Sequence, residues 1–232
     1  MTKRHERRCL LLAGGLDAAR NHPRYGHELL WWGERLDAAG FVCWAALGDG
    51  AVPTTPTSSI KLTSAARADV SAGLTWLTKL GKDDLGLLVV SNHGNSSGIC
   101  LWGPDVLTPS ELQHALEPAK GTLVLVMGQC RGGVFGTLAG PRTVVVSACA
   151  DHESSWACPP PPGLAYDEFL YQLGTALFGA PKDAPQPGPA RRPLSLVEAF
   201  YWARAQDRRQ APPKQETPMM FDPAGLASGI FL

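Results

Sequence analysis

The sequence predicts an α/β protein, a three-layer α/β/α sandwich with a mostly parallel central sheet. Apolar runs of strand length recur along the chain, with helical patterns between them. These runs are continuous rather than alternating, as at residues 123–127, which is typical of strands covered on both faces in a parallel sheet. The 232 residues, of which 44% are hydrophobic, are enough to form one core of this kind.

The expected elements alternate between strand and helix, which is the pattern of a layered α/β fold. We expect strands at residues 8–13, 41–47, 85–91, 122–128 and 142–148. We expect helices at residues 25–39, 64–80, 110–116, 164–178 and 194–208.

Two proline-rich stretches interrupt this alternation. Residues 52–59 have the composition of a turn-forming surface loop, and residues 180–189 that of a flexible or extended linker. We therefore expect a core at residues 1–179, a proline-rich linker at 180–193, and a C-terminal helix and tail at 194–232 that complete the same domain.

The charge balance argues against nucleic acid as a partner. The chain has 21 Lys and Arg against 21 Asp and Glu, and no basic stripe alternates with aromatic residues. No apolar run approaches the roughly 20 residues that a membrane helix requires. The apolar run that follows the charged opening is also too short for a secretory signal. We expect neither a nucleic acid nor a membrane as partner.

The six cysteines favour a reducing compartment. They form no Cys-x-x-Cys pair and no dense framework of the kind that staples small secreted domains. Cys9, Cys43 and Cys100 lie within apolar runs, so we expect them to be core thiols. A cytoplasmic location is the resulting expectation.

Neither a metal nor an organic cofactor is expected. Cys149, His152 and Cys158 have a spacing that matches no common zinc site, and a fourth ligand is not evident. Gly14 and Gly15 follow the first expected strand, but the third glycine and the distal acid of a dinucleotide fingerprint are missing.

Two reactive side chains stand where neighbouring strands are expected to end. His93 follows the apolar run at residues 85–91, and Cys130 follows the next buried run at 122–128, 37 residues further along the chain than His93. In a parallel sheet these exits lie at the same carboxyl edge, where ligands of open α/β sheets bind. We therefore expect His93 and Cys130 to face one cleft.

A cysteine beside a histidine suits nucleophilic catalysis on a carbonyl group. The thiol attacks as a thiolate, which a neighbouring imidazole can generate, and His93 would later protonate the leaving amine. The N–H groups of Gly94 and Cys130 are expected to form the oxyanion hole. The alternative is that His93 lies in a polar loop by chance and that Cys130 is one more buried thiol. The matched strand-exit positions favour the catalytic interpretation.

The same residues resemble the dyad motifs of one clan of cysteine peptidases. Ser-Asn-His-Gly at residues 91–94 and Gln-Cys-Arg-Gly at 129–132 resemble the motifs of legumains, caspases, metacaspases, gingipains and the glycosylphosphatidylinositol transamidase. Caspases carry an extra residue between Gln and Cys, which is missing here, so the legumain branch is the closer match up to about residue 178. The resemblance implies the caspase-haemoglobinase fold and a cysteine endopeptidase.

Two further segments resemble the specificity region of legumains. Residues 151–158 are similar to a Glu-Ser-Ser-Tyr-Ala-Cys segment with a tryptophan in place of tyrosine, and residues 21–25 are similar to an Asn-Tyr-Arg-His segment. By this resemblance Arg24 and Glu153 would line the primary specificity pocket. The substrate-binding residues implied by the resemblance are Arg24, Glu153, Ser155 and Trp156.

The paired charges of such a pocket would select a neutral amide. Glu alone would select a basic side chain and Arg alone an acidic one, whereas both together offer an acceptor and a donor cluster to Asn. Legumains add an acid from a segment that aligns roughly with residues 177–179, where no acid stands. Asp167, Glu168 and Asp183 are near in sequence but are not matched by the motif.

The sequence thus predicts a cysteine endopeptidase, or a transamidase with the same acyl-enzyme, that cleaves protein or peptide substrates after Asn and, as second choice, after Asp. Control by a regulatory protein partner, by pH or by cleavage in the proline-rich linker is expected. Two alternatives stay open: a caspase-like protease with acidic or basic specificity, and a non-enzymatic partner-binding subunit that retains the fold.

Overall fold

The computed structural model describes residues 5–51, 59–159, 166–184, 188–189 and 192–232. The surface loop predicted at 52–59 lies, apart from Ser59, outside the described residues. So do residues 185–187 and 190–191 of the predicted linker.

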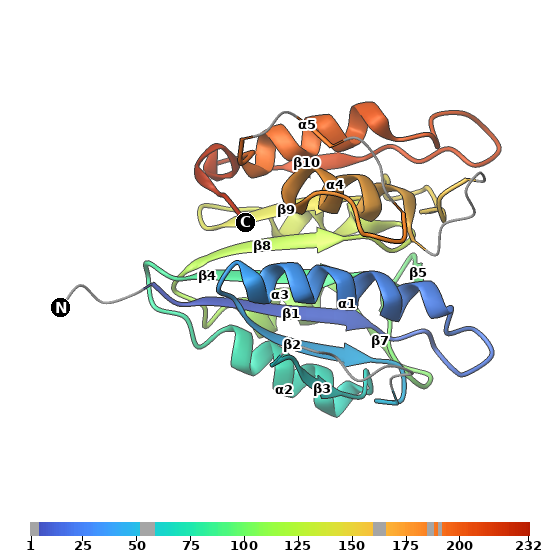
Figure 1. Ribbon diagram of the computed structural model, residues 1–232. Helices are drawn as coiled ribbons and strands as arrows, with labels where there is room; N and C mark the ends of the chain where they lie inside the picture. Colours follow the sequence, from blue (N-terminus) through green and yellow to red (C-terminus); the bar gives the residue numbers. More distant parts are fainter. Residues whose placement is uncertain (1–4, 52–58, 160–165, 185–187, 190–191) are drawn as a thin grey trace.

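A seven-stranded sheet crosses the molecule in the order β10-β9-β8-β4-β1-β2-β3 (Figure 1). All neighbouring strands are parallel except β10, which is antiparallel to β9. The strands are β1 (Arg7–Ala13), β2 (Val42–Leu47), β3 (Lys61–Thr63), β4 (Leu85–Val90), β8 (Thr122–Met127), β9 (Thr143–Ser147) and β10 (Met219–Phe221). A second, three-stranded sheet contains β5 (Gly94–Asn95), β6 (Gly98–Cys100) and β7 (Val106–Leu107).

Helices cover both faces of the large sheet. They are α1 (Pro23–Ala38), α2 (Arg67–Leu77), α3 (Pro109–Leu116), α4 (Glu168–Phe178) and α5 (Leu196–Gln206), with 3-10 helices η1 (Gly132–Leu138) and η2 (Leu226–Gly229). In Figure 1, α1, α4 and α5 lie in front of the sheet, and α2 and α3 lie behind it. The predicted α/β fold class is confirmed, and each strand and helix expected from the sequence is present.

The helical layers on both faces of the sheet explain why the apolar runs are continuous. Along β8, Val124 and Val126 point into the core under α1, α4 and α5, while Leu123 and Leu125 point into the core under α2 and α3. Because both faces of the strand are buried, every position is apolar. The three-residue strands β3 and β10 at the sheet edges were not predicted, because so short a run carries no periodic signal.

The first turn of α1 lies at the carboxyl edge of the sheet. Pro23 occupies the first helical turn, where its missing N–H costs no hydrogen bond, and His22 in extended conformation precedes it. The side chains of Arg24 and Tyr25 project from this first turn, beside the ends of β1 and β4. By contrast α3 and α5 begin with capping boxes, at Thr108 and Ser195.

The chain after the linker packs on the same core. Helix α5 lies against α4, Leu196 is fully buried in the core, and β10 extends the sheet at the edge next to β9. The predicted boundaries of core, linker and tail stay a prediction. None of the helices in the described part of the chain is long and apolar enough to cross a membrane.

Candidate active site

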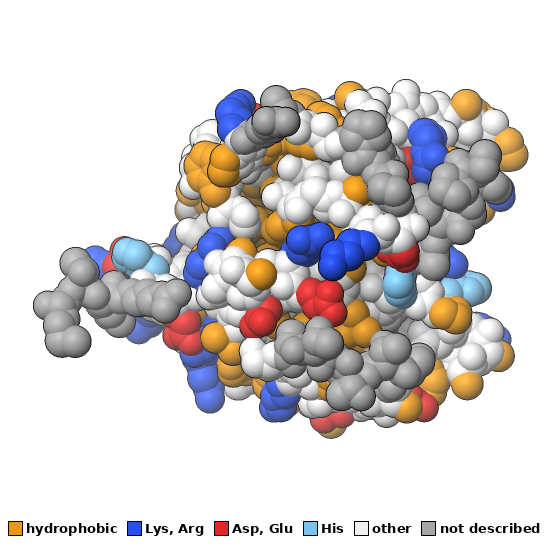
Figure 2. Space-filling view, in the orientation of Figure 1, with side chains coloured by type: hydrophobic (Ala, Val, Ile, Leu, Met, Phe, Trp, Pro, Cys, Tyr) orange, Lys and Arg blue, Asp and Glu red, His pale blue; other side chains and the backbone are white. Residues whose placement is uncertain are grey.

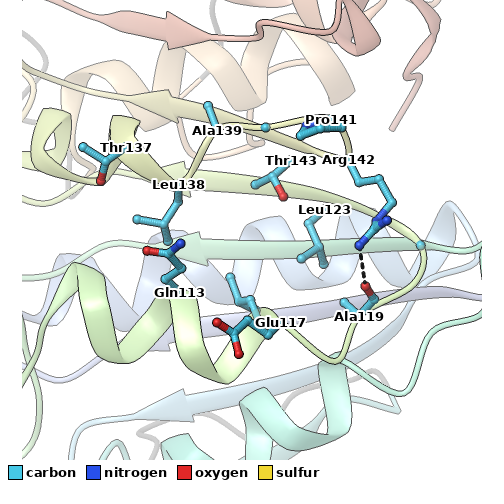
Figure 3. Close-up of a pocket in the computed structure, with 13 residues that line it drawn as sticks. Gln113, Glu117, Ala119, Leu123, Thr137, Leu138, Ala139, Pro141, Arg142 and Thr143 are labelled. Carbon is cyan, nitrogen blue, oxygen red and sulfur yellow. Dashed lines mark hydrogen bonds between the residues drawn. The ribbon is translucent and has the colours of Figure 1, made fainter.

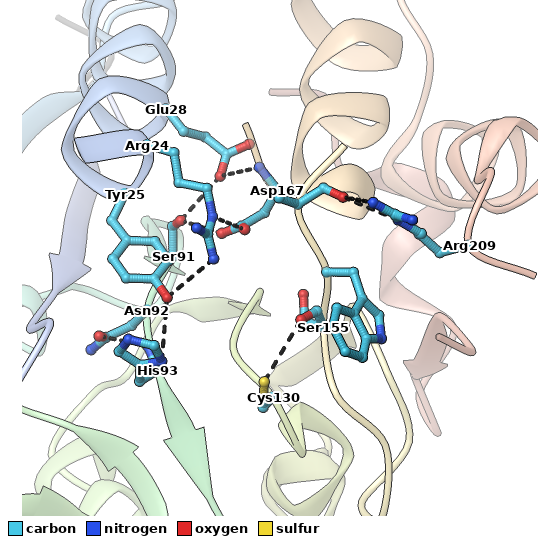
Figure 4. A network of polar contacts seen from close by, with 12 residues as sticks. Arg24, Tyr25, Glu28, Ser91, Asn92, His93, Cys130, Ser155, Asp167 and Arg209 are labelled. Atoms are coloured by element: carbon cyan, nitrogen blue, oxygen red, sulfur yellow. Dashed lines mark hydrogen bonds and ion pairs between the residues drawn. The ribbon is translucent and has the colours of Figure 1, made fainter. Parts of the chain in front are cut away.

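The sheet register brings the two predicted catalytic residues to the same edge. Val90 at the end of β4 is the register partner of Met127 at the end of β8. His93 and Cys130 each follow three residues beyond that matched pair. Figure 4 shows both side chains on the two loops that leave this edge.

The two loops touch at Gly94. A Cβ atom on Gly94 would overlap the carbonyl oxygen of Cys130 and the side chain of Gln129. Only glycine allows the backbone after His93 to approach the nucleophile loop this closely. The predicted glycine beside the histidine thus has a steric reason.

Asn92 anchors the histidine loop from below. Its buried Oδ1 accepts hydrogen bonds from the His93 N–H at 2.7 Å and from the Gly15 N–H at 2.7 Å. Its Nδ2 donates to the carbonyl of Cys100. One side chain therefore ties the histidine to the end of β1 and to β6.

The contacts of His93 assign its tautomer. Nε2 lies 2.9 Å from the carbonyl oxygen of Arg20, which can only accept, so Nε2 carries the hydrogen. Nδ1 is then the basic nitrogen, and it lies 3.4 Å from the hydroxyl of Tyr25. The rings of His22 and Tyr25 pack against His93 at centroid distances of 5.2 and 5.4 Å. The imidazole is thus held with its acceptor nitrogen, Nδ1, toward the Tyr25 hydroxyl.

Cys130 differs from the other five cysteines. All six are described, and Cys130 is the one that is not buried. Its Sγ donates a weak hydrogen bond to the Ser155 carbonyl at 3.7 Å. Burial raises the pKa of Cys149 to about 12, so that thiol stays protonated. Partial exposure to solvent distinguishes Cys130 from the other cysteines.

A left-handed turn exposes the cysteine. Arg131 has φ 58, an uncommon conformation for a residue with a side chain. The turn is held because the Arg131 N–H donates to the Glu153 carbonyl at 2.9 Å. The chain therefore reverses sharply after the nucleophile and enters η1.

An ion pair lies beside the histidine. Arg24 Nε is 2.7 Å from Asp167 Oδ1, with 23% of the Arg24 side chain and 5% of the Asp167 side chain exposed. Arg24 Nη2 donates to the Tyr25 hydroxyl at 3.3 Å, so Tyr25 connects the ion pair to His93. Figure 4 shows these groups on one side of the site, facing Cys130 and Ser155.

The predicted pairing of Arg24 with Glu153 is not formed. The Glu153 carboxylate accepts hydrogen bonds from Thr217 N–H at 2.8 Å, Thr217 Oγ1 at 2.9 Å and Ala150 N–H at 3.1 Å. It is satisfied within its own loop and by the segment before β10. Asp167 is the acid that pairs with Arg24. The resemblance had implied an acid at residues 177–179, about ten positions further along the chain. The partner of Asp167 is 143 residues away, so no local pattern revealed it.

Ser155 and Trp156 form the segment beside the nucleophile. The Ser155 carbonyl accepts from Cys130, and the Trp156 N–H donates to Glu216 Oε2 at 2.8 Å. The Lys214 ammonium lies 5.3 Å from the centroid of the Trp156 ring. The structure thus places Ser155 against Cys130 and holds the adjoining Trp156 from the segment between α5 and β10.

Glu28 was missed by the sequence reasoning. It is fully buried behind the ion pair, with Oε2 3.0 Å from Ser91 Oγ and 3.4 Å from the Asp167 N–H. A Glu within a helix is usually solvated. The available signal was its spacing, because Glu28 lies one turn after Arg24 on the same face of α1.

Cavities lie at both edges of the sheet. One of about 400 Å³ lies at the carboxyl edge and is lined by Asn21, His22, Pro23 and Leu47 among others, and the ring of His22 packs against His93. Another of about 350 Å³ lies at the opposite edge, where β8 and β9 begin, and includes Leu123, Arg142 and Thr143 (Figure 3). The second cavity is remote from the catalytic loops.

The described residues contain no group of three His, Cys, Asp or Glu side chains that could hold a metal ion. His152 pairs instead with Asp151 at the surface, at 2.9 Å. On the face seen in Figure 2, basic and acidic side chains are interspersed.

Comparison with known proteins supports the fold. No family model matches the chain, and no curated protein matches it in sequence. The crystal structure of caspase-1 from Spodoptera frugiperda superimposes with a TM-score of 0.58 at 11% identity, covering 94% of this chain and 86% of that one. Raptor from Chaetomium thermophilum gives a TM-score of 0.46 at 14% identity, covering 74% of this chain and 17% of that one. The chain therefore has the caspase fold, the architecture expected from its strand-exit motifs.

Proposed function

We propose that the protein is a cysteine endopeptidase with Cys130 as nucleophile and His93 as general base and acid. The observation that carries this proposal is the register of β4 and β8, with each residue three positions beyond a matched pair and Gly94 against Cys130. A partly exposed thiol and an imidazole with its lone pair at Nδ1 are the groups that acyl transfer requires.

The proposed reaction has two halves. The Cys130 proton passes to His93 Nδ1, and the sulfur attacks the peptide carbonyl carbon. The C–N bond then breaks as the imidazolium donates that proton to the leaving amine, leaving a thioester on Cys130. Water hydrolyses the thioester with His93 as base, and an amine in place of water gives transamidation. We assign the oxyanion contacts to the N–H groups of Gly94 and Cys130.

We further propose that Arg24 and Asp167 read the side chain before the scissile bond. The pair is close to neutral overall, and it offers guanidinium N–H donors next to a carboxylate acceptor. A primary amide matches both, so Asn is the preferred residue, as in legumains, and Asp is second through Arg24. Glu153 does not belong to this pocket, because its carboxylate is taken up by Thr217 and Ala150.

Ser155 and Trp156 are proposed to bind the substrate backbone. The Ser155 carbonyl lies next to Cys130, and we propose that the substrate backbone runs along this segment. A protein or peptide substrate follows from this geometry. The legumain-like branch, a regulatory partner and the cytoplasmic location stay predictions.

The test is cleavage of fluorogenic peptides that differ only in the residue before the scissile bond. Wild type should cleave the Asn peptide best, and Cys130→Ala and His93→Ala should each lose several orders of magnitude in kcat/KM. Cys43→Ala, which removes a buried core thiol, is the matched control. Full activity of a folded Cys130→Ala variant would contradict the proposal.

The same test separates the alternatives. A caspase-like protease would prefer an acidic or basic peptide over Asn. A non-enzymatic subunit would cleave no peptide, and a thiol-reactive peptide probe would label Cys130 no faster than the same reagent without its peptide portion.

A further inference from the structure

Behind the proposed specificity pocket lies Glu28, a buried acid that forms no ion pair among the described residues. Glu28 projects from α1 toward the end of β4 and the start of α4, and it is 0% exposed. Within the described residues its Oε1 atom is buried and has no hydrogen-bond partner. The mechanism proposed above gives this carboxyl no role.

The hydroxyl of Ser91 bridges Glu28 to the pocket. Ser91 Oγ lies 3.0 Å from Glu28 Oε2 and 2.7 Å from Asp167 Oδ2. Asp167 uses its other oxygen, Oδ1, for the ion pair with Arg24. The three side chains therefore form a row that ends at the guanidinium, as Figure 4 shows.

Counting hydrogens decides how this row is arranged. A hydroxyl has one hydrogen and can donate to only one of the two carboxyls. If Glu28 were ionised, one of the two carboxylate oxygens would face a lone pair of Ser91 without a hydrogen between them. If Glu28 is a carboxylic acid, its O–H donates to Ser91, and Ser91 is left to donate to Asp167. The second arrangement satisfies every close contact. A proton on Asp167 would do the same, but Asp167 is the partner of the Arg24 guanidinium, so the proton belongs on Glu28.

The surroundings of Glu28 favour the same state. Burial, and next the negative charge of Asp167, raise the pKa of Glu28 well above its ordinary value. The titratable and charged groups that face it are Arg24 from α1, Tyr166 and Asp167 from the segment before α4, and Cys158 from the preceding loop. Of these only Arg24 is a cation, and its guanidinium is paired with Asp167.

We propose that Glu28 is a positioning residue of the specificity pocket, a buried hydrogen-bond donor that turns the Ser91 hydroxyl toward Asp167 and so holds Asp167 against Arg24. This inference rests on the proposed function, since Arg24 and Asp167 are the pocket that it positions. It also extends that function: the neutral Glu28 keeps the pocket suited to an uncharged amide. Loss of its proton adds a negative charge behind Asp167 and removes the Ser91 bond to one of the two carboxylates.

The consequence is a specificity that changes with pH. While Glu28 is protonated, the pocket prefers Asn. As the pH rises through the pKa of Glu28, the kcat/KM ratio of an Asn peptide to an Arg peptide should fall. Taking a ratio of two substrates cancels every effect of pH on the chemical step that both peptides share.

Three variants test the donor role. Glu28→Gln keeps an N–H donor for Ser91 and cannot ionise, so it should keep the Asn preference and show a flat ratio from about pH 5 to about pH 9. Glu28→Leu has no donor and should lower kcat/KM for the Asn peptide about tenfold or more. Glu34→Gln removes a charge from the exposed side of the same helix and should follow wild type at every pH. Equal pH profiles of the ratio in wild type and Glu28→Gln would overturn the proposal.

The melting temperature tests the row of Glu28, Ser91 and Asp167 without any substrate. A Glu has an unfolded pKa of about 4.3, and its folded pKa is raised here, so wild type loses stability as the pH rises from the unfolded toward the folded value. The melting temperature of Glu28→Gln minus that of wild type should therefore increase with pH and then level off. A difference independent of pH would contradict a protonated Glu28. If wild type cleaves no peptide, the proposed function fails, whereas this measurement still decides the state of Glu28.

Discussion

At the scale of single residues, the site depends on close approaches that allow few substitutions. Gly94 lets two loops touch, Asn92 ties one of them to the sheet, and the Arg20 carbonyl fixes which nitrogen of His93 is basic. Each of these contacts acts on the position of the dyad rather than on the chemistry itself.

Gly94→Ala should separate the two catalytic loops. Its Cβ would overlap the Cys130 carbonyl, and because that neighbour is backbone, one loop must move. A displacement of about 1 Å between reacting groups costs about 100-fold in rate, so kcat should fall by about that factor. Gly140→Ala, where a Cβ meets nothing within 4 Å, is the control. Unchanged kcat in Gly94→Ala would mean that the loops do not need this contact.

Asp167→Asn should change which substrate is accepted. The substitution leaves the Arg24 charge without its partner, so the preference should move from Asn toward acidic residues by about tenfold in the ratio of kcat/KM values, about 1.4 kcal/mol. Arg24→Gln should move it toward basic residues. Glu153→Gln is the informative comparison, because Glu153 holds Thr217 and should affect melting temperature and not the ratio. A uniform loss across all peptides in Asp167→Asn would assign that residue a structural role.

At the scale of elements, the segment between α5 and β10 braces the loop that carries Trp156 and Ala157. Glu216 in that segment accepts from the Trp156 N–H, and Arg209 donates to the Ala157 carbonyl at 2.6 and 3.1 Å. Asp207 and Glu216 are both buried, and their carboxyls face each other. One oxygen of each carboxyl is buried without a hydrogen-bond partner among the described residues, and we expect the two carboxyls to share a proton.

The brace should depend on pH. Burial raises the pKa of Asp207 from 3.8 to about 6, so the stability linked to its bound proton is present below about pH 3.8 and is lost as the pH rises through 6. Asp207→Asn keeps an oxygen for the Arg209 N–H and does not ionise. Its melting temperature relative to wild type should rise by about 2 °C or more between pH 4 and pH 7. Exposed Asp151→Asn is the control, and a difference that stays constant over this range would contradict the shared proton.

At the scale of the whole molecule, the caspase fold supplies the framework on which this site is built. The parallel register sets the positions of the loops that carry His93 and Cys130. Helix α1 supplies Arg24, Tyr25 and Glu28 from one side, and the segment before α4 supplies Asp167. The site is therefore assembled from four distant parts of the chain at one edge of the sheet.

Chelators should leave the whole protein unaffected. The thiol and the imidazole of the proposed dyad need no metal, and His152 pairs with Asp151 rather than with the cysteines. Incubation with EDTA should change neither the rate of peptide cleavage nor the melting temperature. Stoichiometric zinc in the purified protein, with loss of activity on its removal, would contradict this expectation.

The sequence by itself determined the five longer strands of the large sheet, the α-helices and the loops that carry His93 and Cys130. These features are local: a continuous apolar run and the polar residues that end it are adjacent in the chain, so periodicity and motif suffice. The tertiary structure alone decided the partner of Arg24, the burial of Glu28 and the anchoring of Glu153. Those contacts join residues 143, 139 and 64 positions apart, and which of several acids meets a given arginine depends on how α1 and α4 pack. Helix packing is a property of the assembled core, and the local sequence does not specify which acid it brings to Arg24.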